Sequence, residues 1–252
     1  MSLTLKYVKN GNFQALKDIL ELTDSHINYL DEKGKTPLIW AAQLDFVEIA
    51  ELLLNYGADP DIFDMGGYRA LTYAGRNSNY SIIDLLLAKG SNINLLNKKN
   101  ESILFQLADA TFEKTGKIKP KPQVLSRMIN AGADLSLSTK LGTSPLMESC
   151  RYGATDAARV FLEEGANPNQ KNKDGRTALM IAISFHVFDK NERKKSILEL
   201  LLERHIDYDI DLLVTDKKGT SCMDLVHMFE LEKIYTINLL TKTPAKKNRI
   251  SL

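Results

Sequence analysis

A glycine that recurs at a nearly fixed interval constrains the fold of this chain more than any other feature. Gly34, Gly67 and Asn100 are each 33 residues apart, and the same slot returns at Gly142, Gly175 and Gly219. A second series of slots contains Gly57, Gly90, Gly132, Gly165 and His205. Such a period is typical of proteins built from stacked supersecondary units, in which each unit buries its apolar side against its neighbours.

Residues 34–61 show what one unit contains. Thr36 can cap a helix through its hydroxyl, and Pro37 suits the first helical position, where no amide donor is needed. Apolar residues at helical spacing then predict two short helices, the second between Val47 and Leu54. Gly57 follows the second helix, where a left-handed residue commonly ends a helix. One unit is therefore a pair of helices followed by an exit loop.

The repeated signatures resemble those of the ankyrin repeat family. Thr36-Pro37-Leu38 and Ser144-Pro145-Leu146 match its helix start. Its Gly-Ala-Asp exit is matched by Gly57-Ala58-Asp59, Gly132-Ala133-Asp134 and Gly165-Ala166-Asn167. The resemblance implies an all-α, ankyrin-repeat solenoid of stacked helix–turn–helix units with finger loops, and about seven repeats including end caps.

We expect a single ankyrin-repeat domain over residues 1–240 and a basic, disordered tail over residues 241–252. The units are expected near residues 5–33, 34–66, 67–99, 100–141, 142–174, 175–218 and 219–240. The first unit begins too late for a full first helix. Its polar residues, Lys9 among them, would cover the outer end of the stack.

Three departures from the family pattern carry structural expectations. The motif histidine is replaced by Ile39, Thr72, Phe105, Met147, Met180 and Asp224, so we expect its hydrogen bonds between repeats to be missing and the array to be less stable. Gly75 lies within a first helix, where glycine costs about 0.5–1 kcal/mol relative to alanine, so we expect that helix to be short or frayed. Basic insertions between helices are expected at residues 109–123 and near residues 188–195.

The composition limits the classes of function. Lys and Arg total 33 against 32 Asp and Glu, and this near-neutrality argues against nucleic acid as a partner. Cys150 and Cys222 are isolated and are expected to be reduced, buried thiols, which suits a cytoplasmic protein. We find no apolar run that predicts a signal peptide or a membrane span, and export without a signal stays open. We expect a monomer.

No arrangement of residues predicts catalysis. His26, His186, His205 and His227 are scattered and lack the spacing of metal ligands. Neither cysteine has a nucleophile signature, and the glycines fit turns rather than a phosphate-binding loop. We therefore expect no enzyme activity, no metal and no cofactor.

The resemblance implies that partners meet the concave face, which the inner helices and finger tips form. The candidate residues on inner helices are Trp40, Gln43, Tyr73, Arg76, Glu148, Arg151, Tyr152 and Phe185, and those in a finger are Ile62, Phe63 and Met65. Because Trp, Tyr and Arg dominate binding hot spots, one hypothesis is an exposed patch of Trp40, Tyr73, Arg76 and Tyr152 beside Phe63. The alternative is that these aromatics pack between neighbouring helices and only stabilise the stack.

The first functional hypothesis is a protein-binding module that docks a folded partner, as an inhibitor of the immunity type or as an adaptor. Its variant is a secreted effector that binds host proteins. The second is binding to an anionic surface or nucleic acid through the basic loops and tail, and the third is an enzyme with an unrecognised site. We interpret the finger-edge lysines as solvated charges: Lys98, Lys99, Lys140, Lys171, Lys173, Lys217 and Lys218.

Overall fold

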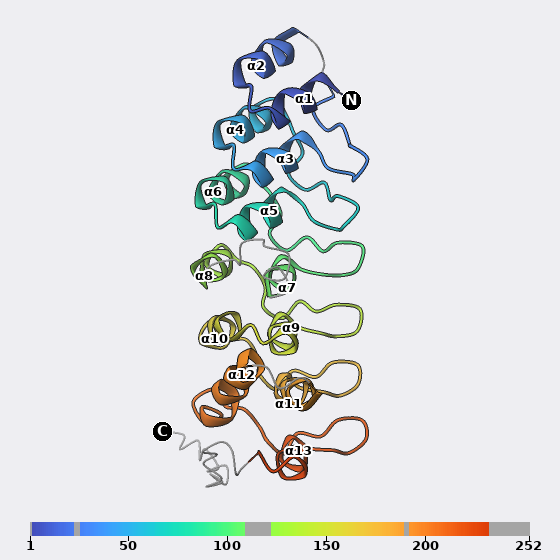
Figure 1. Ribbon diagram of the computed structural model, residues 1–252, viewed down its shortest axis with the longest axis vertical. Helices are drawn as coiled ribbons and strands as arrows, with labels where there is room; N and C mark the ends of the chain where they lie inside the picture. Colours follow the sequence, from blue (N-terminus) through green and yellow to red (C-terminus); the bar gives the residue numbers. More distant parts are fainter. Residues whose placement is uncertain (1, 23–25, 109–121, 189–191, 232–252) are drawn as a thin grey trace, which may run out of the picture.

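Helix pairs stack into two columns along the long axis of the molecule (Figure 1). The computed structural model describes residues 2–22, 26–108, 122–188 and 192–231. Within these residues the inner helices, next to the finger loops, are α1 (Leu3–Lys9), α3 (Pro37–Leu44), α5 (Ala70–Asn77), α7 (Ile103–Ala108), α9 (Pro145–Tyr152), α11 (Ala178–Phe188) and α13 (Cys222–Met228). The outer helices are α2 (Phe13–Leu22), α4 (Val47–Asn55), α6 (Tyr80–Ala88), α8 (Pro122–Asn130), α10 (Thr155–Glu163) and α12 (Glu192–Glu203).

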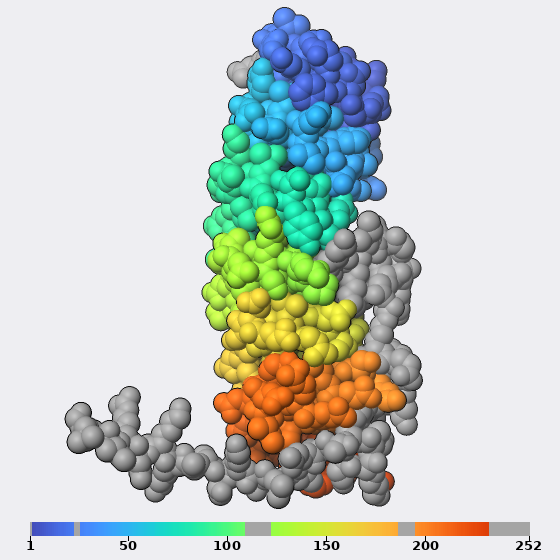
Figure 2. All heavy atoms as spheres, turned by 90° about the vertical axis from the view of Figure 1, so that its left-hand side faces the viewer, coloured from blue at the N-terminus to red at the C-terminus, as the bar shows by residue number. Residues whose placement is uncertain are grey.

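The described part of the chain is thus helical, as expected, and contains no β-strand. The outer helices face the viewer in Figure 2, where the layers follow one another in chain order. Leucines at equivalent positions of successive inner helices are fully buried, among them Leu38, Leu71 and Leu104. Burying each such side chain stabilises the stack by about 1.5–3 kcal/mol. The core is therefore a continuous seam between layers rather than a single centre.

A hydroxyl at the same position begins most inner helices. The Thr36 Oγ1 accepts the backbone N–H of Ile39 at 3.1 Å, and Ser102 and Ser144 cap α7 and α9 in the same way. These bonds satisfy amides that have no partner within the helix. In α5 this position is held by Arg69, which makes no capping bond with its side chain. The side chain of Arg69 therefore makes its contacts elsewhere, with neighbouring parts of the stack.

Each finger turns at the recurrent glycine slot. Gly34 has a φ of 73° and Asn100, in the equivalent slot, has a φ of 64°. Glycine adopts this left-handed conformation at no steric cost, and asparagine tolerates it better than most residues. The interval seen in the sequence therefore marks the fingertips.

The first repeat is more complete than we expected. Helix α1 has seven residues against eight in α3, and it buries Thr4, Leu5 and Val8. The expectation that the first unit lacks a full first helix was wrong, because residues 3 and 4, before the expected start of the unit, already belong to the helix. Lys9 also departs from its expected place, since it lies over the ring of Trp40 instead of capping the end of the stack.

The prediction that Gly75 shortens its helix was also wrong. Helix α5 has eight residues, the same as α3. A Cβ atom at Gly75 would lie 3.0 Å from Leu107 Cδ1 and 3.2 Å from Met128 Cε. The glycine therefore lets the next repeat approach closely, and this packing offsets its low helix propensity.

Loss of the motif histidine does not remove every hydrogen bond between repeats. The Thr72 hydroxyl donates to Gln106 Oε1 at 2.9 Å, and Gln106 Nε2 donates to the carbonyl of Gly67 at 2.7 Å. Both side chains are buried. At this interface the expected gap is filled by a threonine–glutamine pair.

Part of each range predicted as an insertion is helical in the structure. Helix α8 begins at Pro122, inside the first expected loop, and residues 109–121 lie outside the described residues. In the second expected insertion, near residues 188–195, residue 188 ends α11 and residues 192–195 begin α12. The extra residues thus lengthen both helices. The proposed tail, residues 241–252, also lies outside the described residues.

Candidate protein-binding face

A row of alternating cations and aromatic rings crosses the inner face of the first three repeats. The Lys9 Nζ lies 4.2 Å from the centroid of the Trp40 ring. The Lys35 Nζ lies between two rings, 4.8 Å from the centroid of Trp40 and 4.5 Å from that of Tyr73. Such contacts contribute about 0.5–2 kcal/mol each, most where water is excluded. We call Lys9, Trp40, Lys35 and Tyr73 the cation–aromatic ladder.

Two finger carboxylates fix the orientation of the rings. The indole N–H of Trp40 donates to Asp31 Oδ2 at 2.8 Å, and the hydroxyl of Tyr73 donates to Asp64 Oδ2 at 2.7 Å. The other oxygen of each carboxylate accepts backbone N–H groups of its own finger, from Lys35 to Asp31 and from Tyr68 to Asp64. Each aspartate therefore ties an inner helix to the turn of its finger.

The charge states of the ladder follow from these bonds. Burial alone would raise the pKa of Asp31, but hydrogen bonds from the Lys35 amide, the Trp40 indole, the Lys33 amide and the Lys9 ammonium together hold that pKa below its ordinary value. Burial raises the pKa of Tyr73 well above its ordinary range, and the bond to Asp64 raises it further. At neutral pH Asp31 is charged and Tyr73 is a neutral donor.

Two other candidates extend the ladder. The amide oxygen of Gln43 accepts a hydrogen bond from Lys35 Nζ. Arg76 is buried, and its guanidinium carbon lies 3.8 Å from the centroid of Tyr68, which meets Tyr73 edge to face. Arg76 therefore packs against Tyr68, which in turn contacts Tyr73, and it is not an exposed anchor for a partner.

A second group lies at the inner ends of the fifth and sixth repeats. The Arg151 guanidinium is 5.6 Å from the ring of Tyr152 and 5.6 Å from that of Phe185, and it pairs with Glu148 at 4.0 Å. The Arg151 side chain is 51% exposed and Phe185 is 36% exposed, whereas Glu148 is buried. This group is separate from the ladder, so the structure does not bring Tyr152 together with Trp40 and Tyr73.

The finger candidates differ in exposure. Ile62 and Phe63 are half-buried, and the Arg69 guanidinium lies 5.8 Å from the Phe63 ring. Met65 is 79% exposed at its fingertip. Among the three, Met65 offers most of its side chain to a partner.

Sequence reasoning missed Lys9, Lys35, Asp31 and Asp64. A signal for the two aspartates was present: the residue three before each recurrent glycine slot is polar throughout, as Asp31, Asp64, Asn97, Thr139, Asn172 and Asp216. These residues bond the backbone of the finger turn. The contacts of Lys9 with Trp40 and of Lys35 with Tyr73 join neighbouring repeats, and no local pattern shows them.

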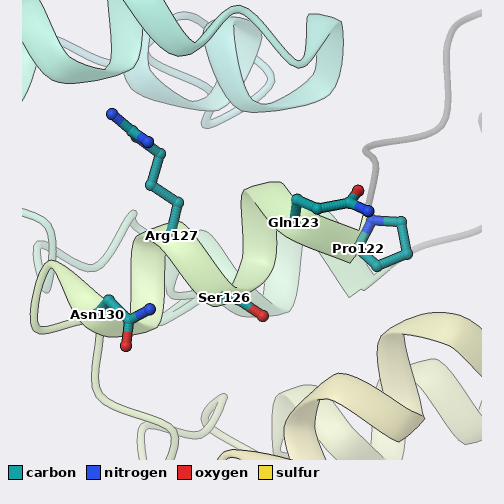
Figure 3. Close-up of a pocket in the computed structure, with 5 residues that line it drawn as sticks. All are labelled: Pro122, Gln123, Ser126, Arg127 and Asn130. Carbon is teal, nitrogen blue, oxygen red and sulfur yellow. The ribbon is translucent and has the colours of Figure 1, made fainter.

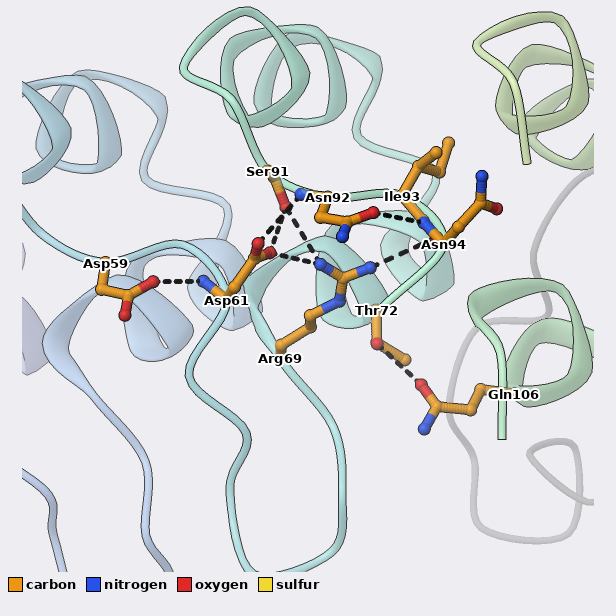
Figure 4. A network of polar contacts seen from close by, with 9 residues as sticks. All are labelled: Asp59, Asp61, Arg69, Thr72, Ser91, Asn92, Ile93, Asn94 and Gln106. Atoms are coloured by element: carbon orange, nitrogen blue, oxygen red, sulfur yellow. Dashed lines mark hydrogen bonds and ion pairs between the residues drawn. The ribbon is translucent and has the colours of Figure 1, made fainter. Parts of the chain in front are cut away.

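Arg69 holds the second and third repeats together (Figure 4). It is 1% exposed and forms an ion pair with Asp61, and it also donates to Ser91 Oγ at 3.2 Å and to the carbonyl of Ile93 at 3.4 Å. Asp61 in turn accepts the backbone N–H of Asn92 at 2.9 Å. The network is interior and satisfied, so its role is structural.

A pocket of about 500 Å³ lies on the outer column, along α8. Pro122, Gln123, Ser126, Arg127 and Asn130 line it, and Arg127 points away from Ser126 toward α6 (Figure 3). Arg127 is bonded there to Asp84 through its Nε at 2.7 Å. The lining contains the hydroxyl of Ser126, but no histidine, carboxylate or cysteine that could activate it or act as an acid or base.

Other chemistry is equally sparse in the described part of the chain. No group of His, Cys, Asp and Glu there has a geometry that would hold a metal ion. Cys150 and Cys222 are buried free thiols, and burial raises the pKa of Cys150 to about 12 and that of Cys222 to about 11. None of the described helices has the length and apolar character to cross a membrane. The exposed side chains of the inner face are the strongest candidate site.

The fold and this face define a class: a helical repeat protein with finger loops and an inner surface for contacts. Residues 5–97 and 118–212 match the family described as ankyrin repeats (three copies). The chain belongs to the ankyrin repeat family. This confirms the resemblance found in the sequence.

Two solved structures share the fold. The ankyrin repeat domain of Bcl-3, a member of the IkappaB protein family, has a TM-score of 0.72 at 18% identity, over 89% of this chain and 93% of that one. An ankyrin repeat domain from Acinetobacter baumannii has a TM-score of 0.61 at 25% identity, over 79% of this chain and 96% of that one. The first likeness shows the fold alone.

Curated relatives match over part of their length. An L-asparaginase of Dirofilaria immitis is 28% identical over 69% of this chain, and a mouse protein named for ankyrin repeats and a SAM domain is 35% identical over 40% of it. The chain spans 27% of the first and 11% of the second. Ankyrin repeats generally mediate protein–protein interaction, and the fold is typically a non-enzymatic binding module.

Proposed function

We propose that this protein docks a folded partner protein on its inner face, as an inhibitor of the immunity type or as an adaptor. The observation that carries the proposal is the cation–aromatic ladder. Trp40 and Tyr73 are partly exposed, yet cations and carboxylates fix both rings. Side chains ordered in advance lose little entropy on binding, and Trp and Tyr are the commonest hot spots.

The chemistry of the ladder narrows the kind of partner surface. Lys9 and Lys35 place positive charge over the partly exposed rings of Trp40 and Tyr73, and the carboxylates of Asp31 and Asp64 accept the polar hydrogens of those rings. The matching partner surface carries apolar side chains surrounded by hydrogen-bond acceptors. Four or five repeats supply the roughly 800 Å² per partner that a standard interface buries. The group of Arg151, Tyr152 and Phe185 gives the same partner a second contact further along the face.

The test is affinity purification from the native cell extract, followed by titration of the purified partner. The variant Trp40→Ala/Tyr73→Ala removes the rings, and Phe13→Ala/Tyr56→Ala is a matched control on the outer column, where Phe13 is 36% and Tyr56 is 41% exposed. Truncating each hot spot weakens binding by about 2 kcal/mol, which is about thirtyfold. We expect the first variant to lose the partner and the control to retain it.

A folding defect is distinguished from a lost contact in two ways. Circular dichroism shows whether each variant keeps the helical signal of the wild type. The variant Trp40→Phe/Tyr73→Phe keeps an aromatic ring at both positions while it removes the polar donors, so it should retain more of the affinity than Trp40→Ala/Tyr73→Ala. A partner that binds Trp40→Ala/Tyr73→Ala as tightly as the wild type would show that the ladder only stabilises the stack.

The partner's identity then separates the finer roles. An enzyme or toxin whose activity falls on binding defines an inhibitor, and two proteins held at once define an adaptor. Partners drawn only from a foreign host would define a secreted effector instead. We place the protein in the cytoplasm because its two described cysteines are free and buried. We expect it to act as a monomer.

A further inference from the structure

The fingertips of the last four described fingers carry an unusual share of the positive charge. Their exposed tip residues are Lys98, Lys99, Lys140, Leu141, Lys173, Asp174, Lys217 and Lys218. That is six lysines against one aspartate, in a chain whose formal net charge is +1. The first two tips differ, with Glu32 beside Lys33 and with the uncharged pair Met65 and Gly66. The basic charge is therefore concentrated along one part of one edge.

The structure explains why this edge is basic. The polar residue at the base of each tip turns its oxygen inward: Asn97 accepts the N–H groups of Lys99 and Glu101, and Asp216 accepts those of Lys218 and Thr220. These oxygen atoms are used within the turn, and the lysines occupy the exposed positions at its tip. No ion pair holds any of the six lysines within the described residues. Lys171 is not part of the row, because its Nζ donates to the carbonyl of Thr215 at 2.7 Å.

Hydrogen bonds between neighbouring fingers make the row rigid. Asn100 Nδ2 donates to the carbonyl of Ser138 at 2.9 Å, joining the third and fourth fingers. The backbone N–H of Lys173 donates to Leu141 O at 2.9 Å, and that of Lys217 donates to Asp174 O at 3.0 Å. The lysines are therefore held at the spacing of the repeats, about 8–10 Å, the packing distance of neighbouring helices.

We propose that this fingertip row, formed by Lys98, Lys99, Lys140, Lys173, Lys217 and Lys218, binds an extended acidic segment of a protein. An extended chain rises about 3.3 Å per residue, so an acidic side chain at every third position meets successive fingers. The four fingers match a segment of about ten residues. Leu141, 68% exposed between Lys140 and Lys173, offers an apolar contact within the row.

The details of the row favour a polypeptide over nucleic acid. Single strands are bound by basic grooves with aromatic side chains on which the bases stack, and none of the tip residues in the row is aromatic. Residues 241–252 of this chain do not suit the site, because they carry three lysines and one arginine and no acidic residue. The occupant is therefore an acidic segment of another protein, and the proposal is independent of the inner face.

The test is fluorescence anisotropy with the full chain and a fluorescein-labelled peptide of about twelve residues, rich in Glu and Asp with interspersed Leu. The variant Lys98→Gln/Lys140→Gln/Lys173→Gln/Lys217→Gln removes one charge from each finger. The matched control, Lys6→Gln/Lys17→Gln/Lys89→Gln/Lys195→Gln, removes as many charges from exposed lysines on or beside the helices. The four lysines replaced in each variant are all solvent-exposed, so both variants should fold.

We expect the fingertip variant to bind the peptide about tenfold or more weakly than the wild type, and the control to bind within about twofold. Added salt should weaken wild-type binding, since the contacts are exposed charges. Equal losses in the two variants would overturn the proposal, because the effect would then follow net charge. Tighter binding of an oligothymidylate of equal length would also overturn it and assign the row to nucleic acid.

Discussion

The indole nitrogen of Trp40 lies 2.8 Å from Asp31 Oδ2, and 33 residues later the hydroxyl of Tyr73 lies 2.7 Å from Asp64 Oδ2. The same relation between inner helix and finger thus occurs twice, with two different aromatic donors. In the third finger Asn97 replaces the aspartate, and Gln106 donates instead to the carbonyl of Gly67. The aromatic rings that are bonded to finger carboxylates therefore belong to the N-terminal repeats.

Removing the polar donors of these rings should weaken the stack moderately. Trp40→Phe and Tyr73→Phe each delete one hydrogen bond to a carboxylate, and bonds to charged groups contribute about 1.5–3 kcal/mol. Urea unfolding should show each loss in the free energy of unfolding. Tyr56→Phe, at an exposed hydroxyl on the outer column, should leave it unchanged. A loss of equal size in that control would show that the effect does not come from the hydrogen bonds to Asp31 and Asp64.

Acid should remove the contribution of Asp31. Its pKa is lower in the folded protein than in the unfolded chain, so the charged carboxylate stabilises the fold above the unfolded pKa of about 3.9. That stability is lost as the pH falls through the lower, folded value. Asp31→Asn should therefore be less stable than the wild type at about pH 6, and the difference should shrink toward about pH 2.5. A difference that stays constant over this range would contradict the assignment.

The buried and the exposed arginine–aspartate pairs should differ strongly. Arg69→Ala removes a fully buried guanidinium and leaves Asp61, 22% exposed, without its charge partner, which should cost about 3 kcal/mol, the lower end of the range for buried pairs. Arg127→Ala breaks an exposed pair with Asp84, where the side chains are 45% and 50% exposed, and water screens such a pair, so the loss of stability should be much smaller. Chemical denaturation of both variants measures the contrast. Equal losses would show that the Arg69 network contributes no more than a surface pair.

Filling the space at Gly75 should destabilise the protein in spite of a better helix propensity. Alanine gains about 0.5–1 kcal/mol in the helix, but its Cβ meets Leu107 and Met128, both buried, at 3.0–3.2 Å. Overpacking of this kind costs about 1–3 kcal/mol. Gly75→Ala should therefore lower the melting temperature.

The double variant Gly75→Ala/Leu107→Val isolates that crowding. The smaller valine makes room for the added methyl group, so the double variant should be more stable than the sum of the two single changes predicts. Strict additivity would mean that the two positions do not crowd each other. A melting temperature that rises in Gly75→Ala alone would show that the neighbouring side chains move aside at low cost.

The sequence by itself determined the repeat. The interval of the glycine slot, the Thr-Pro-Leu start and the Gly-Ala-Asp exit are local patterns, because a left-handed turn and a capped helix each require particular residues within a few positions. For the same reason the sequence identified Trp40 and Tyr73 as residues of the inner helices. Their positions relative to the repeated motif were enough to place them on the inner helices.

Only the tertiary structure decided what those residues touch. Lys9 and Lys35 lie over rings in a neighbouring helix, Arg69 pairs with Asp61 inside the stack, and Gly75 makes room for the next repeat. Each relation depends on how one layer sits on another, which local propensity does not encode. The propensity of glycine predicted a frayed helix, and contacts across the layer boundary outweighed it. Interactions within a repeat follow from its own residues, whereas those between repeats follow from their packing.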